Sequence, residues 1–179
     1  VAIGMDALGT NVDGSRSVAI GDSALATQDP ASAVDTYNTA VGHGAGSAVT
    51  TGVQNTLIGG LAGDAITTAA NNTALGFSSL SQNTTGAANV AVGASALNAN
   101  TTASNNTAVG INALLANTTG SNSVAIGVNA LDAVTTQGAN VAVGYNASTN
   151  LVTTGVTAIG YQAMATSTTG YDTVAVGQS

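Results

Sequence analysis

The sequence of 179 residues has very little charge and few large side chains. Charged residues make up 5% of the chain and aromatic residues 3%, whereas about 25% of an ordinary globular domain is charged. Cysteine and tryptophan are absent, and phenylalanine and proline occur once each. Disulfides, thiol chemistry and cysteine-based metal sites are therefore excluded. The shortage of large side chains means that any core must be thin.

Positive charge is almost absent too. Arg16 is the single basic residue beside eight aspartates, and the net charge is −7. Nucleic acids and anionic membrane surfaces both attract clusters of lysine and arginine, so the sequence predicts neither partner. No apolar run approaches the roughly 18 residues of a membrane span, and we expect no membrane insertion.

A five-residue motif recurs along the whole chain. It reads Asn or Ser, Thr or Val, Ala, an aliphatic residue and Gly. Its repeat glycines are Gly4, Gly21, Gly42, Gly59, Gly76, Gly93, Gly110, Gly127, Gly144, Gly160 and Gly177. The intervals between them are 17, 21, 17, 17, 17, 17, 17, 17, 16 and 17 residues. A period this regular predicts a repeat protein, with an insertion near residues 28–37 and an irregular coil near residues 145–160.

The residue before each repeat glycine is always aliphatic, and we call this set the aliphatic column. We predict that it is buried as the core ladder of the stacked coils, formed by Ile20, Val41, Ile58, Leu75, Val92, Val109, Ile126, Val143, Ile159 and Val176. The glycines themselves fit positions with positive φ or a tight backbone approach at the end of a strand.

The residue two before each repeat glycine is alanine in every copy except Leu57. Neighbouring residues of a strand point to opposite faces, so we expect this alanine column to face away from the core. Its uniformly small size indicates close packing against another subunit. The candidate subunit contacts are Ala19, Ala40, Ala74, Ala91, Ala108, Ala125, Ala142, Ala158 and Ala175.

Three further features complete each coil. A leucine four residues after the glycine, as at Leu97, predicts a second apolar ladder. A Thr-Thr pair often followed by Gly predicts a turn. An Asn opens many motifs, as at Asn106, and at the coil corner its amide either satisfies backbone groups or stacks as an amide ladder. Together these signals predict an all-β fold, a parallel β-solenoid of about ten 17-residue coils stacked about 4.8 Å apart. No polar cap is visible at either end, and we expect residues 1–179 to be one array within a longer fibre.

Two stretches resemble known repeat families. Asn122-Ser123-Val124-Ala125-Ile126-Gly127 reproduces the hallmark of the head repeats of trimeric autotransporter adhesins. Residues 106–120 resemble the repeat arrays of bacteriophage tail fibres, and the likeness extends over essentially the whole chain. The resemblance implies a left-handed parallel β-roll, three chains side by side and a role in attachment. The period of 17 residues is longer than the spacing usual in adhesin heads.

Catalytic and metal-binding motifs are not apparent. His43 is the only histidine, and it occupies the variable position after a repeat glycine, where we interpret it as an exposed loop residue. The glycine cluster Gly42, Gly44 and Gly46 lacks the lysine and the strand–helix context of a phosphate loop. The aspartates do not follow the nonapeptide pattern of calcium-binding β-rolls. We therefore expect no enzyme, cofactor or metal site.

The Thr pairs support an alternative function. Thr50-Thr51, Thr84-Thr85 and Thr118-Thr119 keep the repeat spacing, so stacked coils would align them in a strip like that of an ice-binding solenoid. Ice binders usually carry Thr-x-Thr, which puts both hydroxyls on one face, whereas adjacent residues of a strand point oppositely.

The sequence favours a structural and adhesive fibre segment. We expect it to associate with itself, as a homotrimer or an end-to-end filament subunit, at a bacterial surface or on a phage tail. A cell-surface receptor or glycan would contact the variable residues after each glycine or the insertion. The exposed aromatic candidates are Tyr37, Phe77, Tyr145, Tyr161 and Tyr171.

Overall fold

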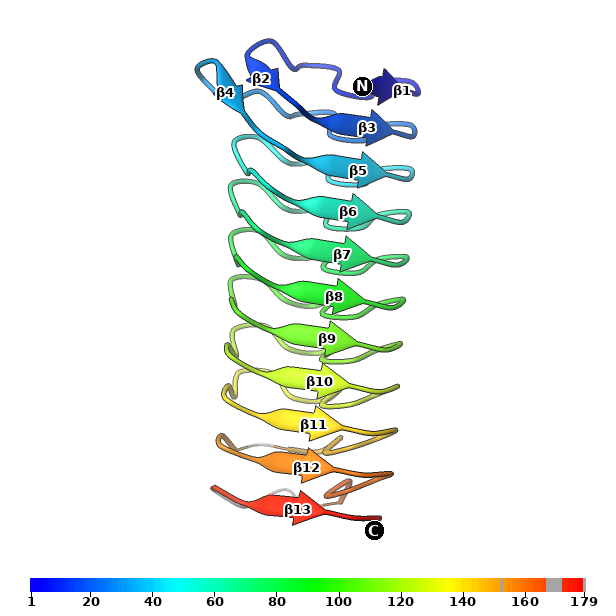
Figure 1. The fold of residues 1–179 in the computed structure, drawn as a ribbon, viewed down its shortest axis with the longest axis vertical. Coiled ribbons are helices and arrows are strands. Elements are labelled where there is room, and N and C mark those ends of the chain that lie inside the picture. The colour runs from blue at the N-terminus through cyan, green and yellow to red at the C-terminus, as the bar shows by residue number, and fades with distance from the viewer. Residues whose placement is uncertain (152, 167–171, 179) are drawn as a thin grey trace.

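The chain forms a straight rod of stacked coils, as seen in a computed structural model that describes residues 1–151, 153–166 and 172–178 (Figure 1). Each coil contributes one short strand to the same side of the rod. The N-terminus and the C-terminus lie at opposite ends (Figure 1). The predicted parallel β-solenoid is confirmed, and no helix occurs among the described residues.

Eleven of the strands form one sheet, in which each strand pairs in parallel with the strand of the next coil. The strands are β1 Ala2–Ile3, β2 Gly14–Ser15, β3 Val18–Ile20, β4 Val34–Asp35, β5 Thr39–Val41, β6 Thr56–Ile58, β7 Thr73–Leu75, β8 Val90–Val92, β9 Thr107–Val109, β10 Val124–Ile126, β11 Val141–Val143, β12 Thr157–Ile159 and β13 Val174–Val176. The pairing joins equal positions of neighbouring motifs, as Ala108 with Ala125. Every motif position therefore becomes a column that runs along the rod.

The alanine column lies inside the rod, which corrects the predicted subunit contact. Ala19, Ala40, Ala74, Ala91, Ala108, Ala125, Ala142 and Ala158 are fully buried within the single chain, and only Ala175 in the last described coil is half-buried. They pack against the leucines of the return side of each coil, such as Leu97 and Leu114, which are also fully buried. The interior is so narrow that a leucine on one side leaves room only for an alanine opposite.

The aliphatic column lies outside, so the predicted core ladder is wrong. Ile20, Leu75, Ile126 and Ile159 are 37 to 45% exposed, and Val176 in the last described coil is 73% exposed. Val41, Ile58, Val92, Val109 and Val143 are half-buried by their neighbours in the column. Neighbouring side chains of each strand point to opposite faces, as expected, but the alanines lie on the inner face and the larger aliphatic side chains on the outer face.

The repeat glycines are required by their backbone, as predicted. Their φ angles lie between 129° and 143°, a region that side chains rarely adopt. A Cβ atom at any of them from Gly4 to Gly160 would also collide with the carbonyl group of the next repeat glycine. The column of glycines therefore lets successive coils approach closely at the strand ends.

The predicted amide ladder at the coil corner is confirmed and is fully buried. Asn72 shows the pattern, because its Nδ2 donates to Asn55 Oδ1 at 3.2 Å and to Gly86 O at 3.0 Å, while its Oδ1 accepts the backbone N–H of Asn89 at 3.0 Å. Each buried amide thus bonds to coils on both sides. A second buried ladder links Asn83, Asn100 and Asn117.

The insertion near residues 28–37 forms a shoulder beside the first coils. Within it, β4 pairs with β2 in a separate two-stranded parallel sheet. Figure 1 shows this segment projecting beyond the line of the other coils. The irregular coil near residues 145–160 stays in the stack, because Val156 donates its N–H to Asn140 Oδ1 at 3.0 Å and β12 pairs with β11.

Candidate interaction surface

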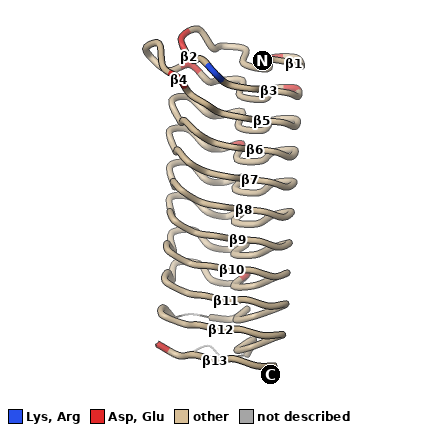
Figure 2. The backbone as a smooth tube through the Cα atoms, in the orientation of Figure 1, with Lys and Arg blue, Asp and Glu red and all other residues tan. Residues whose placement is uncertain are grey.

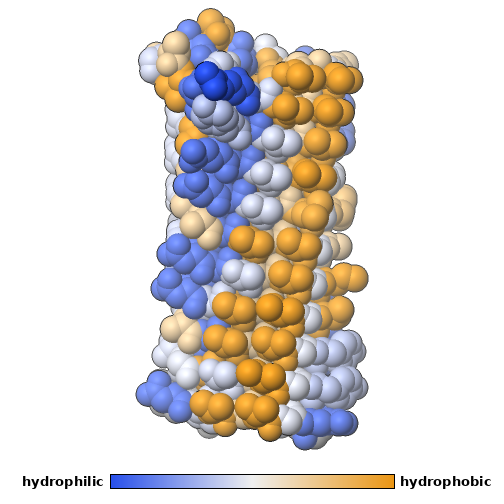
Figure 3. Space-filling view, in the orientation of Figure 1, coloured by the Kyte–Doolittle hydropathy of each residue, from blue (hydrophilic) through white to orange (hydrophobic). Residues whose placement is uncertain are grey.

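The outer face of the long sheet is an uncharged and largely apolar surface, which we call the outer strand face. It consists of the aliphatic column and a second column two residues earlier. The second column contains Val18, Thr39, Thr56, Thr73, Val90, Thr107, Val124, Val141, Thr157 and Val174. Figure 3 shows hydrophobic side chains as a band along the length of the rod. Soluble monomers rarely expose apolar patches larger than a few hundred Å², so a band of this length indicates an interaction site.

The outer strand face carries no charge. Neither of its columns contains Asp, Arg or His. Figure 2 shows that the acidic and basic residues are few and that most of them lie in the first coils. Copies of the chain would therefore meet along this face without bringing like charges into contact, although each copy has a net charge of −7.

The residues directly after the repeat glycines form a third exposed column beside this face. In the later coils this post-glycine column is apolar, with Phe77, Ile111, Tyr145 and Tyr161 between 45 and 61% exposed. The rings of Tyr145 and Tyr161 stack with centroids 5.4 Å apart and planes at 12°. The predicted variable column is thus brought together as a surface of its own.

In the first coils the same column is polar. His43 Nε2 lies 3.4 Å from Asp22 Oδ2, and both side chains are exposed to solvent. Among the described residues there is no group of three or more His, Cys, Asp or Glu side chains that could hold a metal ion. Gly44 and Gly46 near His43 lie in the return segment of the coil with φ of 65° and 59°, positions that Ser and Leu occupy in neighbouring coils.

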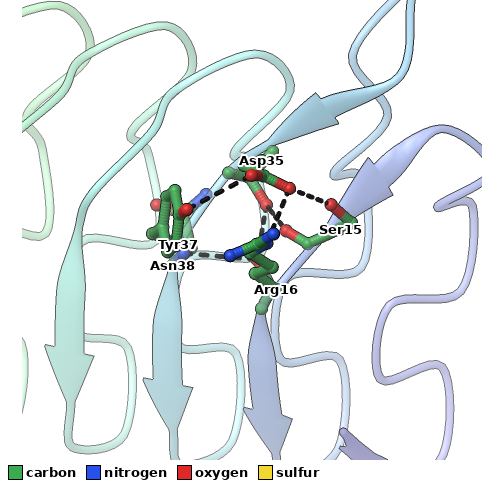
Figure 4. Close-up of polar contacts among 7 residues, drawn as sticks. Ser15, Arg16, Asp35, Tyr37 and Asn38 are labelled. Carbon is green, nitrogen blue, oxygen red and sulfur yellow. Dashed lines mark hydrogen bonds and ion pairs between the residues drawn. The ribbon is translucent and has the colours of Figure 1, made fainter.

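The shoulder holds the only arginine in a closed polar cluster (Figure 4). Arg16 Nε lies 2.9 Å from Asp35 Oδ1, and the guanidinium sits 5.6 Å from the centre of the Tyr37 ring. Ser15 Oγ donates to Asp35 Oδ1 at 2.6 Å and the Tyr37 hydroxyl donates to Asp35 Oδ2 at 3.2 Å. The hydrogen bond from the Ser15 hydroxyl is the main cause that lowers the pKa of the Asp35 carboxyl. Tyr37 and Arg16 lower this pKa further, while desolvation opposes them.

These contacts join β2 to β4 and to the residues that follow each of them. Because the polar groups of the cluster are directed at one another, we interpret it as a clip that holds the insertion against the rod. Tyr37 is therefore separated from Phe77, Tyr145 and Tyr161, which lie in the post-glycine column. Tyr171 lies outside the described residues.

The Thr pairs lie on bends between the strands and not on a flat strand. In five of the pairs the hydroxyl of the first threonine is used inside the solenoid, namely Thr50, Thr67, Thr84, Thr101 and Thr118. Thr84 Oγ1 donates to Thr101 O at 3.1 Å and Thr101 Oγ1 donates to Thr118 O at 3.0 Å, and the same contact recurs along the column. The second threonine of these pairs, such as Thr85, is exposed.

The Thr and Val column of the outer strand face was not predicted from the sequence. The signal was available, because these residues stand two positions before the aliphatic column and so share its side of the strand. The column contains both threonine, as at Thr39, and valine, as at Val18. Such a mixture is typical of a surface position that tolerates either a hydroxyl or a methyl group.

No family model, no curated protein and no solved structure matches this chain. Nor do the described residues include a helix long and apolar enough to cross a membrane.

Proposed function

We propose that this chain is a non-catalytic segment of an extracellular fibre that associates with further copies of itself along the outer strand face. The observation that carries the proposal is the uncharged apolar band that runs the length of the rod (Figure 3). The resemblance to adhesin heads and phage tail fibres supports the same role and favours three copies, at a bacterial surface or on a phage tail.

The size of the face fits this role. Ten coil spacings of about 4.8 Å give a length of roughly 50 Å, and two side-chain columns give a width of roughly 10 Å. Each copy would cover about 500 Å², so two copies would bury about 1,000 Å² and three copies about 1,500 Å². The area for two copies reaches about the lower limit for a specific protein interface, whereas in a trimer the total would be divided among three pairwise contacts.

The interior of the rod supports a mechanical role. Backbone hydrogen bonds between coils, two buried amide ladders and a thin Ala–Leu core repeat along the axis. No coil of this kind is stable alone, so the stack resists local opening except at its ends. A fibre segment needs this stiffness, whereas an enzyme needs a concave site with convergent polar groups.

Light scattering after size exclusion tests the proposal. We expect a mass near three times the 17.0 kDa of one chain. A monomer would contradict self-association through the outer strand face. It would make an ice-recrystallisation assay the next experiment, because the same flat face and the exposed threonines would then be open to solvent.

A further inference from the structure

Two neighbouring columns of different chemistry lie at one corner of the rod, in the coils whose repeat glycines are Gly110, Gly127, Gly144 and Gly160. The post-glycine column carries Tyr145 and Tyr161, which are 45% and 49% exposed. The next residue in three of these coils is an asparagine, namely Asn112, Asn129 and Asn146. We call these five residues the Tyr–Asn strip. Earlier coils lack it, because Ser78 and Ser95 occupy the amide position there.

The amides of the strip form a ladder that is only half-buried. Asn112 Nδ2 donates to Asn129 Oδ1 at 3.2 Å, and Asn129 Nδ2 donates to Asn146 Oδ1 at 3.1 Å. An amide group has two N–H donors and two acceptor lone pairs, so these contacts use only part of its capacity. The ladder therefore holds the amides in fixed orientations and leaves donors and acceptors for a ligand.

The tyrosine rings leave part of their faces uncovered. Their centroids are 5.4 Å apart, whereas two atoms in van der Waals contact are about 3.5 to 4 Å apart. With nearly parallel planes, at 12°, this separation is typical of an offset stack. Ile111 and Val128 extend the apolar column by two more coils and are 52% and 38% exposed.

We infer that the Tyr–Asn strip binds a neutral glycan chain, with the sugar rings on the tyrosines and the hydroxyl groups on the amide ladder. The inference rests on the proposed adhesive role, for which it names the site and the class of ligand. A sugar ring has an apolar C–H face and a polar hydroxyl edge, which match the two columns. Ligand sites commonly combine aromatic surface with a few fixed polar groups in this way.

Two observations set the kind of glycan. The coils repeat about every 4.8 Å, close to the advance of one sugar unit in an extended polysaccharide, so successive sugars would meet successive coils. The strip contains no cationic side chain, and Arg16 lies at the other end of the rod in the shoulder. An acidic glycan would find no counter-charge here, which selects a neutral one.

The strip remains available in the proposed assembly. Tyr145 follows the end of β11 by two residues and therefore lies beside the outer strand face, not within its two columns. Copies that meet along that face would leave the corner reachable. Glycan binding and self-association are thus separate properties of the rod.

Calorimetric titration of the full chain with neutral hexasaccharides tests the inference. The probes are cellohexaose, maltohexaose, laminarihexaose and chitohexaose, with hexagalacturonate as the acidic comparison. We expect at least one neutral probe to bind with a Kd of about 1 mM or tighter, and hexagalacturonate not to bind. The double variant Tyr145→Ala with Tyr161→Ala should weaken that binding at least about tenfold. Alanine already occupies this column at Ala94, so the variant is expected to fold.

Two further variants keep the test specific. Asn129→Ser with Asn146→Ser should also weaken binding, because it removes two amides of the ladder. This variant is expected to fold, since serine occupies the same position in other coils. Tyr37→Ala, on the shoulder, should leave the affinity unchanged. The inference is overturned if no neutral probe binds at about 10 mM, if the acidic probe binds equally well, or if the double tyrosine variant keeps its affinity. A trimer that binds no glycan contradicts only this inference, and a monomer that binds one contradicts only the proposed assembly.

Discussion

Leu57 occupies the space that Gly46 leaves empty. A Cβ atom placed on Gly46 would come within 2.6 Å of Leu57 Cδ1, and one placed on Gly63 would come within 2.8 Å of Leu57 Cδ2. Leu57 is the one exception in the alanine column, and Gly46 and Gly63 are two of the exceptions in the leucine column. The large side chain of Leu57 therefore fills the space left by the missing side chains of Gly46 and Gly63 across the narrow core.

A double-mutant cycle tests this exchange. Leu57→Ala should lower the free energy of unfolding by about 2 to 5 kcal/mol, because it leaves a cavity next to two glycines. Gly46→Leu alone should also destabilise, by collision with Leu57. The two changes together should recover about 0.5 to 3 kcal/mol relative to their sum, as measured by urea unfolding. Leucine tolerates this backbone, since Leu25 and Leu80 have φ of 50° and 51°. Strict additivity would contradict the account.

The repeat glycines should be far more sensitive than the glycines outside the motif. Gly93→Ala places a side chain at φ 131° and against the backbone of Gly110. We expect it to cost about 3 kcal/mol or more in thermal unfolding. The matched control is Gly60→Ala, whose Cβ would only contact Phe77 Cδ2 at 3.5 Å. Equal losses in the two variants would show that the close approach of the coils is not the cause.

The buried amide ladder should contribute more than an exposed asparagine next to it. Asn72→Ala leaves the N–H of Asn89 buried without its partner and removes one of the two amide donors to the carbonyl of Gly86. We expect a loss of about 2 to 4 kcal/mol in the free energy of unfolding. Asn71→Ala is the control, because Asn71 is exposed and its column already tolerates Ala88 at φ 56°. A loss at Asn71 as large as that at Asn72 would argue against the ladder.

Asp132 should make the stability depend on pH. Burial raises the pKa of its carboxyl above the ordinary value of 3.8, more than backbone N–H groups lower it, and its Oδ1 is buried without a partner. The neutral carboxyl therefore favours the fold below pH 3.8, and this contribution is lost as the pH rises through the folded-state pKa.

Asp132→Asn should accordingly raise the melting temperature near pH 7 and leave it unchanged near pH 3. Asp6→Asn, at an exposed position, provides the comparison at both pH values. If Asp132→Asn lowers the melting temperature near pH 7, the ionised carboxylate stabilises the coil and the assignment is wrong.

The sequence was sufficient for the repeat, the parallel stacking, the glycine backbone and the amide corner. Each of these depends on a residue type with few alternative roles, such as Gly93 at positive φ or Asn72 at a buried turn. Which side of the strand faces inward was predicted wrongly. Ala108 and Val109 are both apolar, and alternation alone does not say which of them is inside.

The width of the core decides that choice, and it depends on the opposite wall of the coil. Leu57 carried the signal, because the one large residue in the alanine column coincides with glycine at the leucine positions of two coils. The Tyr–Asn strip could not be predicted as a surface, since it needs the post-glycine column to be exposed beside a half-buried amide ladder.

The adjacent residues Ala125 and Ile126 of β10 provide the most direct test of the central claim, that the outer strand face joins copies of the chain. Light scattering and circular dichroism on Ile126→Lys and Ala125→Glu give mass and folding together. We predict a folded monomer for Ile126→Lys and loss of β structure for Ala125→Glu, with Ala133→Lys, exposed elsewhere in the same coil, keeping the native mass. An Ile126→Lys variant that keeps the mass of the native assembly would contradict the claim.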